Sequence, residues 1–311
     1  MMATRSRFPE DNLHSQHIHN LKSSHIQLFQ AQMGYGFPKI EGNGVIMSKN
    51  EDLSNIPVVI LAGGLGTRLR EETEFRPKPM VEIGDRPILW HIMKYFSSYG
   101  MKDFIICLGY RGDVIRDYFL SYQTRNINLS LNLGKDSKTS FLDQHDEDDW
   151  KVTLIETGKS SSTGSRLKQV QEYIGDRTFM CTYGDGLANV DLDELVSFHR
   201  SHSGSATLSA VHPTSRFGVV DILDSGKIEE FHEKPIVDDW INGGYFVLEP
   251  SVFDFFTDEG PFEETPLKSL AQTNNLFAYR HDGFWQPMDT YREYLEMNER
   301  WAKNDTPWRR W

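Results

Sequence analysis

Apolar and polar positions alternate along the chain in a way that predicts strands and helices in turn. Short apolar runs between turn residues predict buried strands, and longer runs with apolar residues three or four positions apart predict helices. Up to residue 183 the two types follow one another, with strands at 57–62, 103–109, 126–133, 151–156 and 178–183 and helices at 87–99, 113–122 and 164–174. This order predicts an α/β fold whose mainly parallel sheet has helices on both faces.

The pattern shifts towards strands after a helix predicted at 192–202. Short strands are predicted at 206–212, 218–222, 228–232, 244–248 and 276–281, and helices at 266–272 and 290–302. No internal repeat or flexible linker interrupts residues 56–311, so we expect one domain with a strand-rich subdomain. The acidic run at 143–149 is predicted to be an exposed loop.

Residues 1–55 differ from the rest because they are polar and show little hydrophobic periodicity. Turn-rich segments at 34–38 and 41–44 interrupt them further. A segment of this composition cannot bury enough apolar surface to fold alone. We therefore predict a largely disordered N-terminal extension.

Composition limits the kinds of partner. The 311 residues carry a net charge of −12, which argues against general affinity for nucleic acid or anionic membranes. No apolar run approaches the roughly 20 residues that span a bilayer, and the N-terminus lacks the hydrophobic centre of a secretory signal. The two cysteines lie in apolar strand-like runs without metal-ligand spacing. A cytoplasmic protein is expected.

A glycine-rich turn follows the first predicted strand and contains Gly63, Gly64 and Gly66. Glycine permits positive φ and lets bare backbone N–H groups approach an anion. Arg68 then offers a planar guanidinium that suits phosphate oxygens. The combination predicts a cradle for a polyphosphate, whereas the glycines alone would favour an ordinary turn.

Other glycine motifs fit less well. A P-loop needs lysine and then serine or threonine after its last glycine, and residues 67–68 are threonine and arginine. The dinucleotide fingerprint needs a small residue where Leu69 stands. Further along, Pro77 and Pro79 flank Lys78 and are expected to hold it in an extended, stiff segment that presents the ammonium to a ligand.

Two aspartates complete the expected site. Asp185 lies in a glycine turn directly after the strand predicted at 178–183. If that strand is parallel to the first one, both turns emerge at the sheet edge where ligands of α/β sheets bind. Carboxylates beside phosphates usually meet through Mg²⁺. Asp289 is a second candidate ligand, although it could instead be the N-cap of a helix that begins at Thr290.

These residues resemble the signature of the sugar-1-phosphate nucleotidyltransferases, most clearly at 61–69 and 78–80. The resemblance covers everything from about residue 56 onward and continues in the motifs at 182–186, 233–235, 242–244 and 283–290. More narrowly, the cytidylyltransferase branch is similar at 71–73, 77–84 and 87–93. Arg76 departs from that branch, which usually has lysine there, so charge is kept but geometry is not.

The resemblance implies a mixed, Rossmann-like sheet with a nucleotide-binding half and a strand-rich sugar-binding subdomain. It implies nucleotide binding by Leu61, Ala62, Gly63, Gly64, Leu65, Gly66, Thr67, Arg68, Lys78, Ser161, Arg166 and Gly184. It implies sugar-phosphate binding by Glu233, Lys234, Asn242 and Gly243. It also implies that Asp185 and Asp289 bind Mg²⁺, and that Arg68, Lys78 and Asp185 are catalytic. For Arg166, surface solvation is the alternative.

The implied activity is transfer of a cytidylyl group from CTP to α-D-glucose 1-phosphate, giving CDP-glucose and pyrophosphate for deoxysugar and surface polysaccharide synthesis. The family also implies a homo-oligomer. Thymidylyl- or uridylyltransfer is an alternative, as is a non-catalytic sensor of sugar nucleotides. The four residues Arg68, Lys78, Asp185 and Asp289 argue against a sensor, since sensing needs neither the metal nor a cation for the transition state.

Overall fold

The computed structural model describes residues 52–134, 138–257 and 259–311. Contacts divide the chain into residues 1–49 and 50–311, and every described residue lies in the second unit. The extension predicted at 1–55 therefore lies outside the described residues up to position 51. Leu53 is buried in the core, so the folded unit begins a few residues before the predicted start at Ile56.

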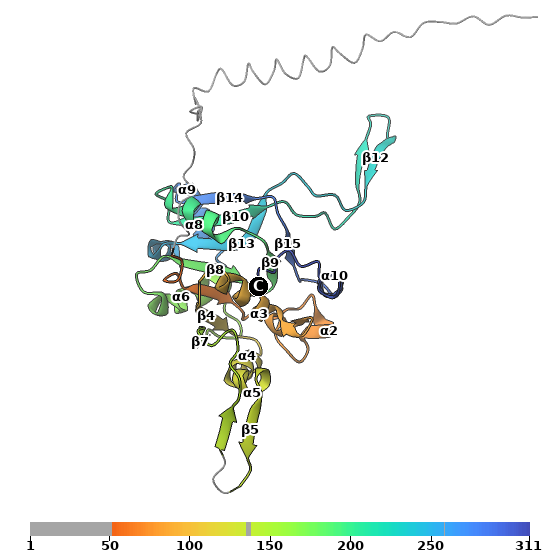
Figure 1. The fold of residues 1–311 in the computed structure, drawn as a ribbon. Coiled ribbons are helices and arrows are strands. Elements are labelled where there is room, and N and C mark those ends of the chain that lie inside the picture. The colour runs from red at the N-terminus through yellow and green to blue at the C-terminus, as the bar shows by residue number, and fades with distance from the viewer. Residues whose placement is uncertain (1–51, 135–137, 258) are drawn as a thin grey trace, which may run out of the picture. The chain divides into compact units, whose positions relative to one another are not determined.

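A seven-stranded sheet lies at the centre of this unit (Figure 1). Its order is β14-β10-β13-β8-β1-β4-β7, and its strands are β1 (Val58–Leu61), β4 (Asp103–Leu108), β7 (Lys151–Glu156), β8 (Phe179–Tyr183), β10 (Ala206–Val211), β13 (Ile241–Leu248) and β14 (Leu276–His281). Strand β13 is antiparallel to both neighbours, and all other pairs in this sheet are parallel. The predicted mixed, mainly parallel α/β sheet is confirmed.

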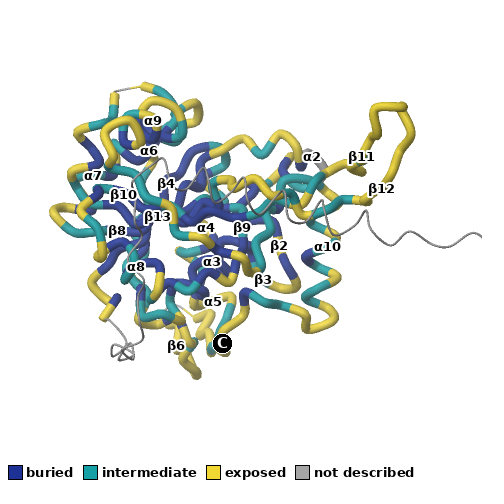
Figure 2. The backbone as a smooth tube through the Cα atoms, turned by 90° about the horizontal axis from the view of Figure 1, so that it is seen from above, coloured by how far each residue is buried: buried dark blue, intermediate teal, exposed yellow. Residues whose placement is uncertain are grey.

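Both faces of the sheet are covered, as predicted. Alternation along β1 sends Val58 and Ile60 to one core and Val59 and Leu61 to the other. The first core packs against α3 (Ile88–Ser97), α4 (Gly112–Leu120), α5 (Tyr122–Asn126), α8 (Leu192–Arg200) and α10 (Tyr291–Ala302). The second packs against α6 (Thr163–Gln169), α7 (Gln171–Ile174), α9 (Thr265–Gln272) and the 3-10 helix η2 (Pro250–Phe255). Figure 2 shows buried segments along the central strands.

The second half of the chain contributes β10, β13 and β14 to the same sheet. Between β10 and β13 the chain leaves it to form a hairpin of β11 (Val219–Ile222) and β12 (Ile228–His232), which extends outward (Figure 1) and is exposed (Figure 2). The strand predicted at 126–133 is shorter than expected and lies outside the central sheet, because β5 (Leu129–Asn132) pairs only with β6 (Lys138–Phe141). Other short elements have no strong sequence pattern: α2 (Arg70–Thr73), η1 (Lys78–Met80), and the strand pairs β2 (Glu82–Ile83) with β3 (Arg86–Pro87) and β9 (Gly186–Ala188) with β15 (Trp285–Pro287).

Two local predictions need correction. The helix predicted at 164–174 is divided at Val170, whose backbone angles leave the helical range. The acidic run at 143–149 is not wholly exposed, because Glu147 is buried and accepts a hydrogen bond from Lys94 Nζ at 2.6 Å. A buried carboxylate needs such a partner, since an unpaired charge in the interior is strongly unfavourable.

His91 on α3 is fully buried where the C-terminal residues pack against that helix. Its Nε2 donates to the carbonyl of Ile83 at 2.9 Å. Its ring packs against four tryptophan rings, those of Trp90, Trp301, Trp308 and Trp311. Burial lowers the pKa of His91 to about 4, although the hydrogen bond to Ile83 opposes the shift. The imidazole is therefore neutral at physiological pH.

This burial predicts a loss of stability in acid. Between about pH 6.5 and pH 4 the unfolded chain binds the His91 proton and the folded protein does not, so protonation favours unfolding. The free energy of unfolding should fall by up to about 3 kcal/mol over this range, at about 1.4 kcal/mol per unit of pKa difference. Urea unfolding at a series of pH values measures the slope. His91→Asn should reduce this slope, because the buried imidazole that causes it is removed.

Candidate active site

A cavity of about 420 Å³ lies at the carboxyl ends of β1 and β8. It brings together every predicted nucleotide-binding residue except Leu65, which is exposed and outside this cavity. Both predicted metal ligands also line it. The full lining consists of Leu61, Ala62, Gly63, Gly64, Gly66, Thr67, Arg68, Lys78, Pro79, Ser161, Ser162, Thr163, Arg166, Tyr183, Gly184, Asp185 and Asp289.

Gly66 and Gly63 are required in the glycine turn for different physical reasons. Gly66 has φ +61°, and its carbonyl accepts hydrogen bonds from Leu69 N at 3.1 Å and Thr73 Oγ1 at 3.0 Å. The prediction of positive φ is wrong for Gly63 and Gly64. At Gly63 the requirement is space, because a Cβ there would lie 2.1 Å from an Arg166 guanidinium nitrogen.

Arg166 on α6 supports this turn from below. It is 4% exposed, so the surface-solvation alternative is wrong. Its guanidinium donates to the Gly63 carbonyl at 3.0 Å, to the Leu108 carbonyl at 2.9 Å and to Thr157 Oγ1 at 2.8 Å. These bonds join the turn after β1 to the ends of β4 and β7. Arg166 thus holds the cradle in place while lining the same cavity.

Lys78 is presented by a turn of helix instead of the predicted extended segment. It begins η1, in which Met80 N donates to the Pro77 carbonyl at 2.8 Å and Val81 N donates to the Lys78 carbonyl at 3.0 Å. Pro79 fits the first turn of a helix because the N–H that it lacks has no partner there. The consequence is still a fixed lysine, with a side chain only 11% exposed.

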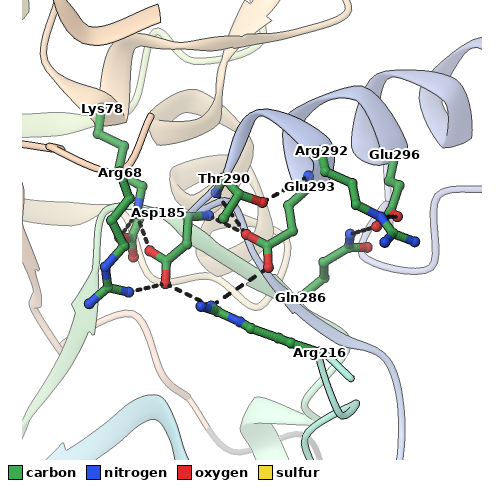
Figure 3. Close-up of polar contacts among 10 residues, drawn as sticks. Arg68, Lys78, Asp185, Arg216, Gln286, Thr290, Arg292, Glu293 and Glu296 are labelled. Carbon is green, nitrogen blue, oxygen red and sulfur yellow. Dashed lines mark hydrogen bonds and ion pairs between the residues drawn. The ribbon is translucent and has the colours of Figure 1, made fainter. Parts of the chain in front are cut away.

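The Lys78 ammonium contacts both acidic residues. Its Nζ lies 2.5 Å from Asp185 Oδ2 and 2.5 Å from Asp289 Oδ1, while Arg68 Nη1 lies 2.9 Å from Asp289 Oδ2 (Figure 3). The two aspartates are 104 positions apart but are joined by the pairing of β9 with β15. Met288 N also donates to the Asp185 carbonyl at 2.8 Å.

Mutual attraction sets the charges of this cluster. Burial works to lower the pKa of Lys78, but Asp185 and Asp289 outweigh it and raise that pKa above its usual value. Burial works to raise the pKa of Asp289, but Lys78, Arg68 and Arg216 outweigh it and hold that pKa below its usual value. The position of the ammonium demonstrates that a cation fits between the two carboxylates. Two convergent carboxylates are a common protein contribution to an Mg²⁺ site.

Asp289 is not the cap of the following helix. Thr290 is the N-cap of α10, since its Oγ1 accepts from Glu293 N at 3.3 Å. Glu293 Oε2 accepts in return from Thr290 N at 2.8 Å, which completes a capping box, and from Asp289 N at 2.7 Å. The carboxylate of Asp289 is thereby left to face Lys78. The helix-cap alternative is wrong.

The residues expected on the sugar side are only partly near the cavity. Asn242 Nδ2 donates to the Tyr183 hydroxyl at 3.3 Å, and Tyr183 lines the cavity. The carbonyl of Gly243 accepts from Trp285 Nε1 at 2.7 Å. Glu233 and Lys234 pair with each other at 2.9 Å, and neither is among the lining residues.

Sequence reasoning missed three side chains at this site. Tyr183 donates to Glu263 Oε1 at 2.5 Å, and Thr163 donates to Glu263 Oε2 at 2.6 Å, so Glu263 holds two lining residues in place. Arg216 reaches Asp289 from the segment between β10 and β11. Tyr183 lies within the motif at 182–186 and could have been found, whereas Glu263 and Arg216 carry no local signal.

A mainly parallel sheet has two cations and two carboxylates at the carboxyl ends of its strands. This arrangement is typical of α/β enzymes that bind phosphorylated ligands. Residues 57–304 match the family model described as nucleotidyl transferase. The chain belongs to the nucleotidyl transferase family.

Curated relatives agree with the narrower resemblance found in the sequence. The glucose-1-phosphate cytidylyltransferase of Salmonella typhi is 49% identical over 258 residues, covering 81% of this chain and 98% of the relative. The probable glucose-1-phosphate cytidylyltransferase of Bacillus subtilis (strain 168) is 44% identical, covering 81% and 99%. The predicted resemblance to the cytidylyltransferase branch is confirmed.

Solved structures agree with the fold. The crystal structure of HddC from Yersinia pseudotuberculosis is 26% identical with a TM-score of 0.57, covering 79% of this chain and 99% of that one. A UDP-glucose pyrophosphorylase complexed with UDP-glucose is 17% identical with a TM-score of 0.58, covering 80% and 99%. Among the described residues, no helix has the length and apolar character required to cross a membrane.

The two roles at the start of α10 can be separated by mutation. Thr290→Ala removes the capping oxygen and should lower the free energy of unfolding by about 1 kcal/mol. Asp289→Asn keeps the size and the cap, so it should change stability less and lower activity far more. Urea unfolding and pyrophosphate release measure both. An Asp289→Asn protein that is as active as wild type would remove Asp289 from the proposed metal site.

Proposed function

We propose that this protein transfers a cytidylyl group from CTP to α-D-glucose 1-phosphate and releases CDP-glucose and pyrophosphate. The observation that carries the proposal is the convergence of Lys78, Asp185 and Asp289 at a cavity lined by the glycine turn. The choice of CTP and glucose is supported by the names of the relatives that are 44% and 49% identical. The product would supply deoxysugar and surface polysaccharide synthesis.

In this reaction a phosphate oxygen of glucose 1-phosphate attacks the α-phosphorus of CTP. A P–O bond forms, and the bond from the α-phosphorus to the bridging oxygen breaks, so pyrophosphate leaves with that oxygen. No protein nucleophile is required. The protein therefore acts by holding the reactants in line and by stabilising charge as it develops.

The named residues divide this work. The backbone of the glycine turn, fixed by Arg166, cradles the triphosphate, and Ser161 and Gly184 line the nucleotide pocket. Arg68 is 68% exposed at the cavity mouth and can meet the triphosphate as it enters. Lys78 is fixed and largely buried, which suits it to the charge on the transferring and leaving phosphates.

Asp185 and Asp289 are the residues that would hold Mg²⁺, which when bound supplies positive charge to the triphosphate. Both carboxylates pair with the Lys78 ammonium here; if they held Mg²⁺, the ammonium would be available to phosphate oxygens. Asn242 and Gly243 remain our candidates for contact with the sugar. Glu233 and Lys234 are weaker candidates because they lie outside the cavity lining.

Two further proposals concern the setting of the protein. Since the reaction consumes a nucleoside triphosphate, we place it in the cytoplasm. Apolar side chains are exposed on the hairpin of β11 and β12, including Ile222, Ile228 and Phe231, and a surface of this kind favours a homo-oligomer. The mass in solution tests the latter point.

Substrate choice is tested by offering each nucleoside triphosphate with glucose 1-phosphate and Mg²⁺. We expect pyrophosphate release to be fastest with CTP, and CDP-glucose to be the product by mass spectrometry. Faster release with dTTP or UTP would replace cytidylyltransfer by thymidylyl- or uridylyltransfer. Tight binding of a sugar nucleotide without turnover of any triphosphate would indicate a sensor.

The role of Lys78 predicts a specific kinetic effect. Lys78→Ala should lower kcat by about 10²-fold or more, as for other groups that stabilise developing charge, and should weaken CTP binding less. Steady-state kinetics with CTP as the varied substrate separate the two. Lys303→Ala is a suitable control because Lys303 is an exposed residue directly after α10 that pairs with Glu299. Near-normal turnover of Lys78→Ala would remove Lys78 from the mechanism.

A further inference from the structure

Arg216 belongs to the segment that connects β10 to the exposed hairpin, and it reaches the acidic end of the cavity. Its Nη2 lies 3.5 Å from Asp289 Oδ2 and 3.8 Å from Glu293 Oε1. Figure 3 shows the side chains of Arg68 and Arg216 coming from different directions, and both guanidinium groups contact Asp289 Oδ2. The side chain of Arg216 is 57% exposed, so a ligand has access to it.

The backbone beside Arg216 is held in place. Thr214 forms an isolated β-bridge with Ile236, and Ser215 N donates to the Pro235 carbonyl at 2.8 Å. These contacts join the segment that leads from β10 into the hairpin to the segment that follows β12. The guanidinium therefore emerges from a fixed point and not from a free loop.

The contacts of Arg216 are not needed for the fold around it. Glu293 already accepts two backbone hydrogen bonds in the cap of α10, and Asp289 already pairs with Lys78 and Arg68. Exposed ion pairs as long as those of Arg216 add little to stability. Three cations thus surround Asp289, which is more than its one negative charge requires.

The positive charge that Asp289 does not neutralise would suit an anionic ligand at this end of the cavity. Arg68 and Lys78 both come from the first 30 residues after the start of β1, the nucleotide side of the site. An in-line transfer places the attacking and leaving oxygens on opposite sides of the α-phosphorus. Arg216 comes from the second half of the chain and contacts the same carboxylate oxygen of Asp289, Oδ2, as Arg68 does.

We propose that Arg216 is a substrate-binding residue whose guanidinium pairs with the phosphate of the sugar 1-phosphate. This inference rests on the proposed function and adds a residue to its sugar-phosphate side. The planar fork of arginine suits two phosphate oxygens. Neither Arg216 nor Lys234 is among the residues that line the cavity, but Arg216 contacts the lining residue Asp289, whereas Lys234, expected in this role from the resemblance, pairs with Glu233.

The test compares KM values for the two substrates. Arg216→Ala should raise KM for glucose 1-phosphate by about tenfold or more and change KM for CTP by less than about twofold, because the lost contact is a charge-assisted hydrogen bond to one substrate. Arg216→Lys should give an intermediate KM, since lysine keeps the charge and loses the fork. Arg292→Ala is the matched control, because Arg292 is similarly exposed but pairs with Glu296 on α10.

Other outcomes overturn the proposal. Unchanged KM values in Arg216→Ala would leave only a surface ion pair, and a rise confined to CTP or equal for both substrates would contradict the assignment to the sugar phosphate. Calorimetric titration with glucose 1-phosphate alone gives a second reading, in which Arg216→Ala should bind more weakly than wild type. If wild type binds glucose 1-phosphate but releases no pyrophosphate with CTP, the proposed function fails while this titration still decides the role of Arg216.

Discussion

The ammonium of Lys78 shared between Asp185 and Asp289 is the contact on which the geometry of the site depends. Each of the three residues is positioned by a different local structure. Lys78 begins a turn of 3-10 helix, Asp185 lies in the glycine turn after β8, and Asp289 lies just before the N-cap of α10. None of these devices alone makes a site. Together they place charges from distant parts of the sequence within hydrogen-bond distance, and the pairing of β9 with β15 fixes their separation.

A second constraint acts on the other side of the cavity. Arg166 is a buried cation whose described hydrogen bonds run to two carbonyl groups and a hydroxyl. A buried charge is unfavourable unless hydrogen bonds compensate it, so moving any of these three oxygens away from the guanidinium would cost stability. That requirement holds the turn after β1 against β4 and β7. It also explains why Gly63 lacks a side chain although its φ is ordinary.

Much of this arrangement follows from local sequence. Strong periodicity predicted strands such as β7 and β12 with their observed bounds, and the residue types around Gly66 and Lys78 predicted a phosphate site. The short strands β9 and β15 were not predicted, because each is three residues long and carries no periodic signal. Arg216 and Glu263 escaped for another reason: they act across 73 and 80 positions of sequence. The helix was predicted to begin at Thr290 but begins one residue later, and this is why the sequence left open the alternative that Asp289 is its N-cap.

The pairing of β9 with β15 also has a consequence for the newly made chain. During synthesis the N-terminal part of a protein leaves the ribosome first and can begin to fold. The glycine turn, Lys78 and Asp185 all emerge long before Asp289, which follows Asp185 by 104 positions. A growing chain that has already assembled its parallel strands therefore has a place for the triphosphate but lacks one of the two carboxylates. The pair of carboxylates is complete only after Asp289 has been made.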